Sequence, residues 1–298
     1  MGNRLTRVIK LHAMHMRSSG EPIDYRDFFE YLTHLPTSAT IVSISPDLNF
    51  AIERCQLDGD NFTATIIAGS PDEVPLYFDY TTGLVEEGAT PEGKWLAKVT
   101  RILVVTDPAA RAIAIESSRT GVTSARLEKY FRRLAAQSEW AEDLLVDFPP
   151  IPSPSLANEI EKFTRIREAA AIVTRPNYDW SDMKNKLSNL ADESNGHAAE
   201  AVVKAERKGS LSKSRGIVEL IRDSLHTANP SIRSFRLTGN QEGSKKEVTI
   251  SSEKHQARAY YDSNTSDLPG EVDAKMFAAA RRLVEERPVE DSIFPDVE

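Results

Sequence analysis

Residues 101–134 constrain the fold of this chain more than any other stretch. The run Ile102–Val105 is apolar and rich in β-branched residues, which is typical of a buried strand. Asp107 and Pro108 then predict a turn, because proline presets the bend and cannot donate a hydrogen bond to a strand ladder. A second strand is expected at Ala112–Ser117. The segment therefore predicts a β-hairpin.

A helix is expected after this hairpin. Gly121 ends the second strand, and Thr123 or Ser124 can cap the helix. Apolar residues at i, i+3, i+4 and i+7 form one face of it: Leu127, Tyr130, Phe131 and Leu134. Basic residues surround that face: Arg126, Lys129, Arg132 and Arg133. The stretch offers no nucleophile, acid pair or metal-ligand group, so it predicts a scaffold with a positive surface.

Length and charge limit the classes of function. At 298 residues the chain is long enough for one large domain or two ordinary ones. Its 37 basic and 45 acidic residues give a net charge of −8 and a pI near 5.4. A protein that coats DNA without specificity has a pI above about 9, so any contact with nucleic acid must come from a local patch. The single cysteine, Cys55, excludes an intrachain disulfide and favours a cytoplasmic protein.

We expect an α+β fold in two domains. The first, residues 1–148, is predicted to be a mostly antiparallel β-sheet with two helices. Its strands are expected at 8–16, 40–44, 50–57, 62–68, 102–105 and 112–117, with an edge strand at 76–80, a loop at 81–93, and helices at 24–35 and after Gly121.

Four prolines in residues 148–154 predict an extended linker at 149–155. The second domain, residues 156–286, is expected to be an α+β sandwich with a mixed sheet and helices. Its helices are expected at 156–163, 181–191, 212–227 and 270–286, and its strands at 169–173, 198–205, 231–237, 246–251 and 256–261. An acidic tail, 287–298, is expected to be solvated.

The patterns of catalytic and metal sites are weak. His12 and His15 lie three residues apart on an expected strand and therefore point to opposite faces. Cys55 is expected to be a buried structural thiol. A two-metal nuclease needs several carboxylates near a lysine, but the candidate groups are typical of a charged surface: Asp58 and Asp60 with Lys94, Glu200 with Lys204, and Glu242 and Glu247 with Lys245. We expect no catalytic residue, no metal and no cofactor.

The positive signal is local charge. Residues 200–260 hold twelve basic and seven acidic residues, a net +5 within a protein of net −8. The densest run extends from Arg207 through Lys208 and Lys213 to Arg215, with glycine and serines between them. Such groups at a helix start are those that contact phosphate oxygens. The same pattern is also typical of a solvated surface.

The order of elements resembles that of a known group of proteins. The residues that support this resemblance are the Arg-Thr-Gly turn at 119–121 before the Leu127–Leu134 helix, and Arg175-Pro-Asn before Trp180. The chain resembles phage and plasmid proteins related to the exclusion protein RexA and to the B subunit of the Kiwa anti-phage system. The resemblance implies a prokaryotic defence protein that binds DNA, is dimeric and works beside a partner.

We therefore expect a non-enzymatic DNA-binding or sensing protein of phage defence or exclusion. The expected contacts to duplex DNA are Arg207, Lys208, Lys213 and Arg215, with Arg132 and Arg133 as a second patch. A homodimer is expected, because two linked sites raise affinity. Two alternatives are a metal-dependent nuclease and an adaptor without DNA binding, whose acidic tail or apolar edge binds a partner. In each case a membrane or effector protein from the same operon is the partner that we consider.

Overall fold

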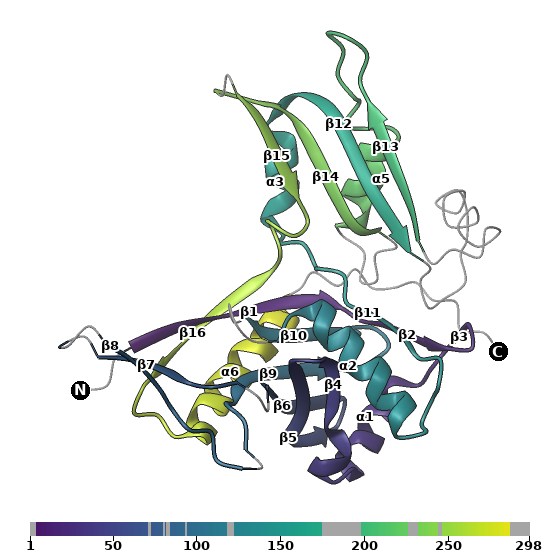
Figure 1. Ribbon diagram of the computed structural model, residues 1–298. Helices are drawn as coiled ribbons and strands as arrows, with labels where there is room; N and C mark the ends of the chain where they lie inside the picture. The colour runs from purple at the N-terminus through teal and green to yellow at the C-terminus, as the bar shows by residue number, and fades with distance from the viewer. Residues whose placement is uncertain are drawn as a thin grey trace.

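The computed structural model describes residues 4–70, 73–79, 81, 84–92, 94–117, 122–174, 198–225, 232–243 and 246–286. The chain forms two lobes, one above the other in Figure 1. Both combine antiparallel strands with helices, so the expected α+β class is confirmed. Among the described residues, no helix has the length and apolar character needed to cross a membrane.

The first lobe is built on a seven-stranded antiparallel sheet of order β16-β1-β10-β9-β6-β5-β4. Most expected strands of the first domain are present in it, with ends shifted by a few residues. Its strands are β1 (Arg4–Ala13), β4 (Val42–Ser45), β5 (Leu48–Asp58), β6 (Asn61–Gly69), β9 (Lys98–Val105), β10 (Ala112–Ser117) and β16 (Arg258–Asn264).

Helices cover both faces of this sheet. On one face α1 (Tyr25–His34) and α2 (Ser124–Gln137) pack over Ile102 and Val104, while α6 (Pro269–Glu285) packs over Leu103 and Val105 on the other. Because successive side chains of a strand point to opposite faces, burial on both faces explains why residues 102–105 of β9 form a continuous apolar run.

The helix that the sequence predicted after the hairpin is α2. Thr123 caps it by accepting from the N–H of Arg126, and Leu127, Tyr130, Phe131 and Leu134 are fully buried. The Arg-Thr-Gly turn at 119–121 lies outside the described residues. A 3₁₀ helix, Thr37–Thr40, and a small sheet of β2 (His15–Ser18), β3 (Glu21–Pro22) and β11 (Leu145–Asp147) complete the core of this lobe.

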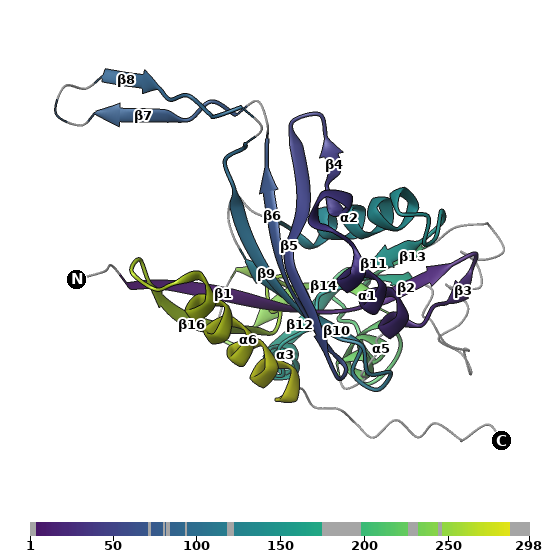
Figure 2. The same cartoon turned by 90° about the horizontal axis from the view of Figure 1, so that it is seen from below.

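A hairpin that we call the arm extends from the end of the main sheet (Figure 2). It consists of β7 (Leu76–Asp79) and β8 (Leu84–Glu87), which pair only with each other among the described strands. The sequence predicted an edge strand at 76–80 and a loop at 81–93. In the structure β7 does not pair with the main sheet. It pairs instead with β8, which lies inside the segment that was expected to be a loop.

The second lobe is a four-stranded antiparallel sheet of order β13-β12-β14-β15, with α3 and α5 on one face. Its described strands are antiparallel throughout, where a mixed sheet was expected. The expected helix at 181–191 and the Arg175-Pro-Asn segment lie outside the described residues. The elements are α3 (Ser155–Glu161), β12 (Phe163–Thr174), β13 (Ala198–Lys204), α5 (Ile217–Ser224), β14 (Ile232–Gln241) and β15 (Glu247–Ser251).

The boundary between the lobes differs from the expected domain at 156–286. β16 pairs with β1 from Arg258 to Asn264, and α6 packs on the same sheet, so the chain returns to the first lobe. The two crossing segments lie side by side: the N–H of Ser153 donates to the carbonyl of His255 (2.7 Å), and that of Ala257 donates to Ile151 (2.8 Å). The second lobe is thus an insertion.

Buried charges fix α6 to the sheet. Arg101 lies 2.5 Å from Asp273 of α6 and 3.0 Å from Glu116 of β10. Burial alone would raise the pKa of Glu116, but hydrogen bonds from Tyr261 and Arg7 and the charge of Arg101 hold it below its usual value. Breaking one such buried pair leaves an uncompensated charge, which is strongly destabilising.

Candidate nucleic-acid interface

The segment 205–216, here called the basic loop, connects β13 to α5 at the end of the second lobe farthest from the first (Figure 1). Backbone hydrogen bonds attach it to β12: Ala205 donates to Arg167 (2.8 Å) and Leu211 donates to Ile166 (2.9 Å). The guanidinium of Arg165 also donates to the carbonyl of Gly209 (2.7 Å). These hydrogen bonds fix the first half of the basic loop, residues 205–211, against β12.

Three of the predicted contact residues project freely from this loop. Arg207, Lys208 and Arg215 are exposed, and among the described residues their side chains form no hydrogen bond or ion pair. Several other cations of this lobe are paired with acids, such as Lys204 and Arg236 with Glu168. Three exposed cations without a partner among the described residues therefore lie together in the basic loop.

Lys213 has a different role from its neighbours. Its ammonium donates to the carbonyl of Glu161 (2.6 Å) at the end of α3 and lies 3.5 Å from the carboxylate of the same residue. Arg222 contacts this carboxylate as well, at 3.4 Å. Lys213 therefore anchors the loop and has less charge to offer a ligand than sequence reasoning assigned to it.

Arg132 and Arg133 do not join this surface, because α2 belongs to the first lobe (Figure 1). The guanidinium of Arg133 donates to the carbonyls of Ser43 and Ile44 on β4, the edge strand of the main sheet. Arg132 is exposed and donates to the carbonyl of Glu128 (3.4 Å). Arg133 therefore links α2 to β4 within the first lobe.

Two of the acids that we considered for a nuclease, Asp60 and Glu247, are paired with arginines. Asp60 pairs with Arg26 at 3.2 Å, and Glu247 pairs with Arg167. Over the part of the chain that the structure describes, no three His, Cys, Asp or Glu side chains are grouped as metal ligands would be. Lys245 lies outside the described residues.

His12 is buried where the chain passes from one lobe to the other. Its Nδ1–H donates to the carbonyl of Phe148 (2.9 Å), and its Nε2 accepts from Gln256 (3.0 Å). Burial lowers the pKa of His12 to about 4, so the ring is neutral at pH 7. Cys55 is half-buried, and burial raises the pKa of its thiol, which disfavours the thiolate needed for nucleophilic attack.

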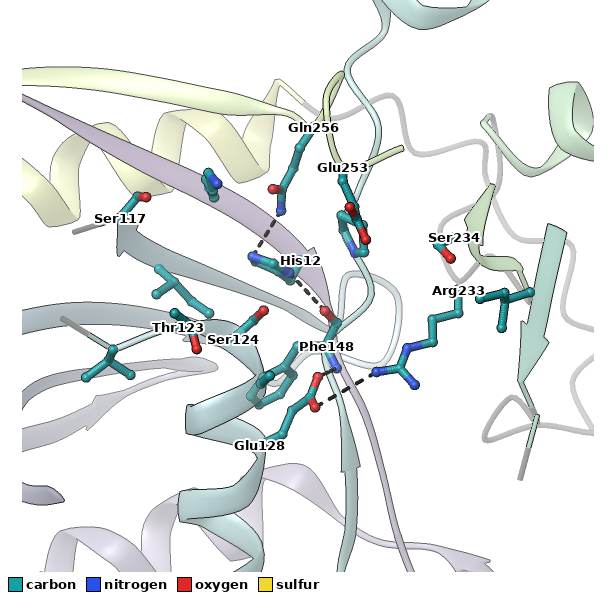
Figure 3. A pocket seen from close by; sticks show the side chains of 16 residues that line it. His12, Ser117, Thr123, Ser124, Glu128, Phe148, Arg233, Ser234, Glu253 and Gln256 are labelled. Carbon is teal, nitrogen blue, oxygen red and sulfur yellow. Dashed lines mark hydrogen bonds and ion pairs between the residues drawn. The ribbon is translucent and has the colours of Figure 1, made fainter. Parts of the chain in front are cut away.

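A cleft of about 540 Å³ lies between the lobes, and sequence reasoning missed it. Arg233 of β14 reaches across it to the first lobe, where it lies 4.0 Å from Glu128 (Figure 3). Its guanidinium also lies 3.0 Å from Asp147. Burial raises the pKa of Glu128, which accepts from the N–H of Phe148. The lining residues come from segments far apart in the chain, among them Lys10, Ser117, Thr123, Ser124, Ser234 and Glu253. No local motif could have predicted this site.

The sequence matches one family model. Residues 100–274 match the family described as Domain of unknown function (DUF4747), which is 175 of 298 residues. The chain belongs to this family. The DUF4747 region begins in β9 and ends within α6, so it includes the basic loop, the second lobe and the returning strand β16, but not the arm. No curated protein matches the sequence. The family description assigns no activity, so the resemblance to exclusion proteins stays a prediction.

Proposed function

We propose that this DUF4747 protein binds duplex DNA without enzymatic activity, as a sensor or binding component of a prokaryotic phage-defence or phage-exclusion system. The observation that supports DNA binding is the set of three exposed cations, Arg207, Lys208 and Arg215, that find no partner among the described residues. The defence context rests on the resemblance in element order alone.

The environment of these cations suits phosphate contacts. A paired surface cation must give up its acid before it can meet a phosphate, whereas Arg207, Lys208 and Arg215 have no acid partner among the described residues of their own chain. The loop is already fixed to β12 by backbone hydrogen bonds, which reduces the entropy lost on binding. Since such contacts reach only the backbone, we expect weak discrimination between sequences.

The test is the salt dependence of binding to a labelled duplex, measured by fluorescence anisotropy between about 50 and 200 mM salt. Each phosphate contact adds about 0.9 to the slope of log affinity against log salt. A triple variant, Arg207→Gln, Lys208→Gln and Arg215→Gln, should therefore reduce the slope by about 2.7. Affinity should fall about equally for all sequences.

Two further variants give matched controls. Arg236→Gln removes a cation that is paired with Glu168, and it should leave the slope nearly unchanged. Lys213→Gln should change the slope less than Arg215→Gln does, because Lys213 already contacts Glu161. If the wild type fails to bind at about 50 mM salt, or if it binds with the same slope as the triple variant, the proposal is wrong. Cleavage of the duplex that requires Mg²⁺ or Mn²⁺ would favour the nuclease alternative instead.

A further inference from the structure

The arm has four large apolar side chains that are mostly exposed to solvent. Leu76, Tyr77, Leu84 and Val85 are 60–66% exposed, and they lie on both faces of a two-stranded hairpin. Such a hairpin is at best marginally stable alone in water, and this one projects away from the body of the first lobe (Figure 2). Clustered exposed apolar side chains of this kind mark an interaction surface.

Charge restricts what the arm can meet. Residues 71–93 contain six acids and no lysine or arginine, so this segment carries most of the net charge of −8. Glu86 and Glu87 of β8 lie opposite Tyr77 and Leu76, at the base of the hairpin. Two arms would repel each other, so the complementary surface must combine apolar side chains with nearby cations.

The same chain offers such a surface on its second lobe. β13 is an edge strand of the four-stranded sheet, and its Val202 and Val203 are 48% and 41% exposed. The basic loop follows directly, and its Arg207 and Lys208 have no partner in the part of the chain that the structure describes. An exposed edge strand with apolar side chains is a template for another strand.

We propose that the arm of one copy docks on β13 of a second copy, with β7 antiparallel to β13. Antiparallel pairing places Leu76 beside the end of β13 at Lys204, and with it the acids Glu86 and Glu87 of the neighbouring strand. These acids then face Arg207 and Lys208. Main-chain hydrogen bonds and alternate side chains are the usual basis of such strand addition. A two-fold axis makes the contact twice and closes a dimer.

The first experiment measures the mass of the full-length protein by light scattering after size exclusion, without DNA. The wild type should give twice the 33.1 kDa of one chain. Leu76→Ser with Val85→Ser should raise the dimer dissociation constant about a hundredfold, because two apolar side chains lose their buried environment in each contact. Val202→Ser with Val203→Ser should have the same effect. Leu145→Ser, which changes an exposed leucine on β11, is the matched control and should leave the dimer intact. Circular dichroism checks that each variant keeps its fold.

The second experiment tests the charge pairing. Glu86→Arg with Glu87→Arg should weaken the dimer, and so should Arg207→Glu with Lys208→Glu. A chain with all four changes should dimerise again, which a merely structural effect of either pair would not produce. A wild type that remains monomeric at micromolar concentration overturns the proposal. A dimer that resists the arm changes, or one that needs the arm but ignores the changes on β13 and the basic loop, overturns it as well. DNA binding is not needed for any of these outcomes.

Discussion

Because the second lobe is an insertion, we can predict which pieces of the chain fold on their own. Replacing residues 154–254 with a short glycine-serine linker joins ends that already lie side by side, since the N–H of Ser153 donates to the carbonyl of His255 at 2.7 Å. This excised protein keeps all seven strands of the main sheet together with α6. We expect it to fold and to unfold cooperatively on heating.

A fragment of residues 1–148, the domain predicted from sequence, should behave differently. It lacks β16 and α6, so Val272 and Met276 no longer cover the sheet. Each of these side chains contributes roughly 1.5–3 kcal/mol when buried. Arg101 also loses Asp273, and breaking a buried pair costs about 3–5 kcal/mol. The total of about 6–11 kcal/mol is comparable with the 5–15 kcal/mol that stabilises a whole domain.

Thermal denaturation followed by circular dichroism compares the two proteins directly. The excised protein should show a sigmoidal transition, and the fragment 1–148 should show none or should aggregate. A fragment that melts cooperatively at the same temperature as the excised protein would refute the reasoning, because β16 and α6 would then add nothing to the first lobe. A one-residue check is Met276→Ala, which should destabilise the intact protein by about 2–5 kcal/mol.

Two further predictions concern buried side chains. Phe131 is fully buried among Phe28, Phe29 and Phe148, so Phe131→Ala should lower the free energy of unfolding in urea by about 3–5 kcal/mol, while the exposed neighbour changed in Arg132→Ala should have little effect. The second concerns pH. The folded-state pKa of His12 is lowered from 6.5 to about 4, so stability is full above pH 6.5 and falls by about 3 kcal/mol as the pH drops to 4. His12→Gln should flatten that part of the profile, and an equal slope in the variant would show that His12 is not the cause.

The local part of the fold could be predicted from sequence, because it depends on neighbouring residues. The hairpin and α2 are visible in the apolar run of β9 and in the i, i+3, i+4 spacing on the helix. The return of β16 to β1 is not visible, since the partners Val8 and Tyr260 are 252 residues apart and no local pattern specifies their pairing. β8 was missed because only two of its four residues are apolar.

The candidate interface, too, could be predicted from the sequence only in part. Composition found the basic loop, but it could not show which cations are free. Lys213 and Glu161 are 52 residues apart in sequence, and only the packing of α3 against the start of α5 brings them together. Arg133 was expected to be a surface cation, yet it contacts two carbonyls of β4. Counting charges in a sequence therefore overestimates the charge available to a ligand.

The two proposals share the basic loop, and this makes their combination testable. An acidic arm from a second copy and the phosphates of DNA would both need Arg207 and Lys208, so they should compete. Leu76→Ser with Val85→Ser, which weakens the arm contact without touching the loop, should then tighten DNA binding at protein concentrations where the wild type is dimeric. At concentrations below the dimer dissociation constant the variant and the wild type should bind alike. An arm variant that binds DNA more weakly than the wild type at every concentration would mean that the arm supports DNA binding, and the competition would be excluded.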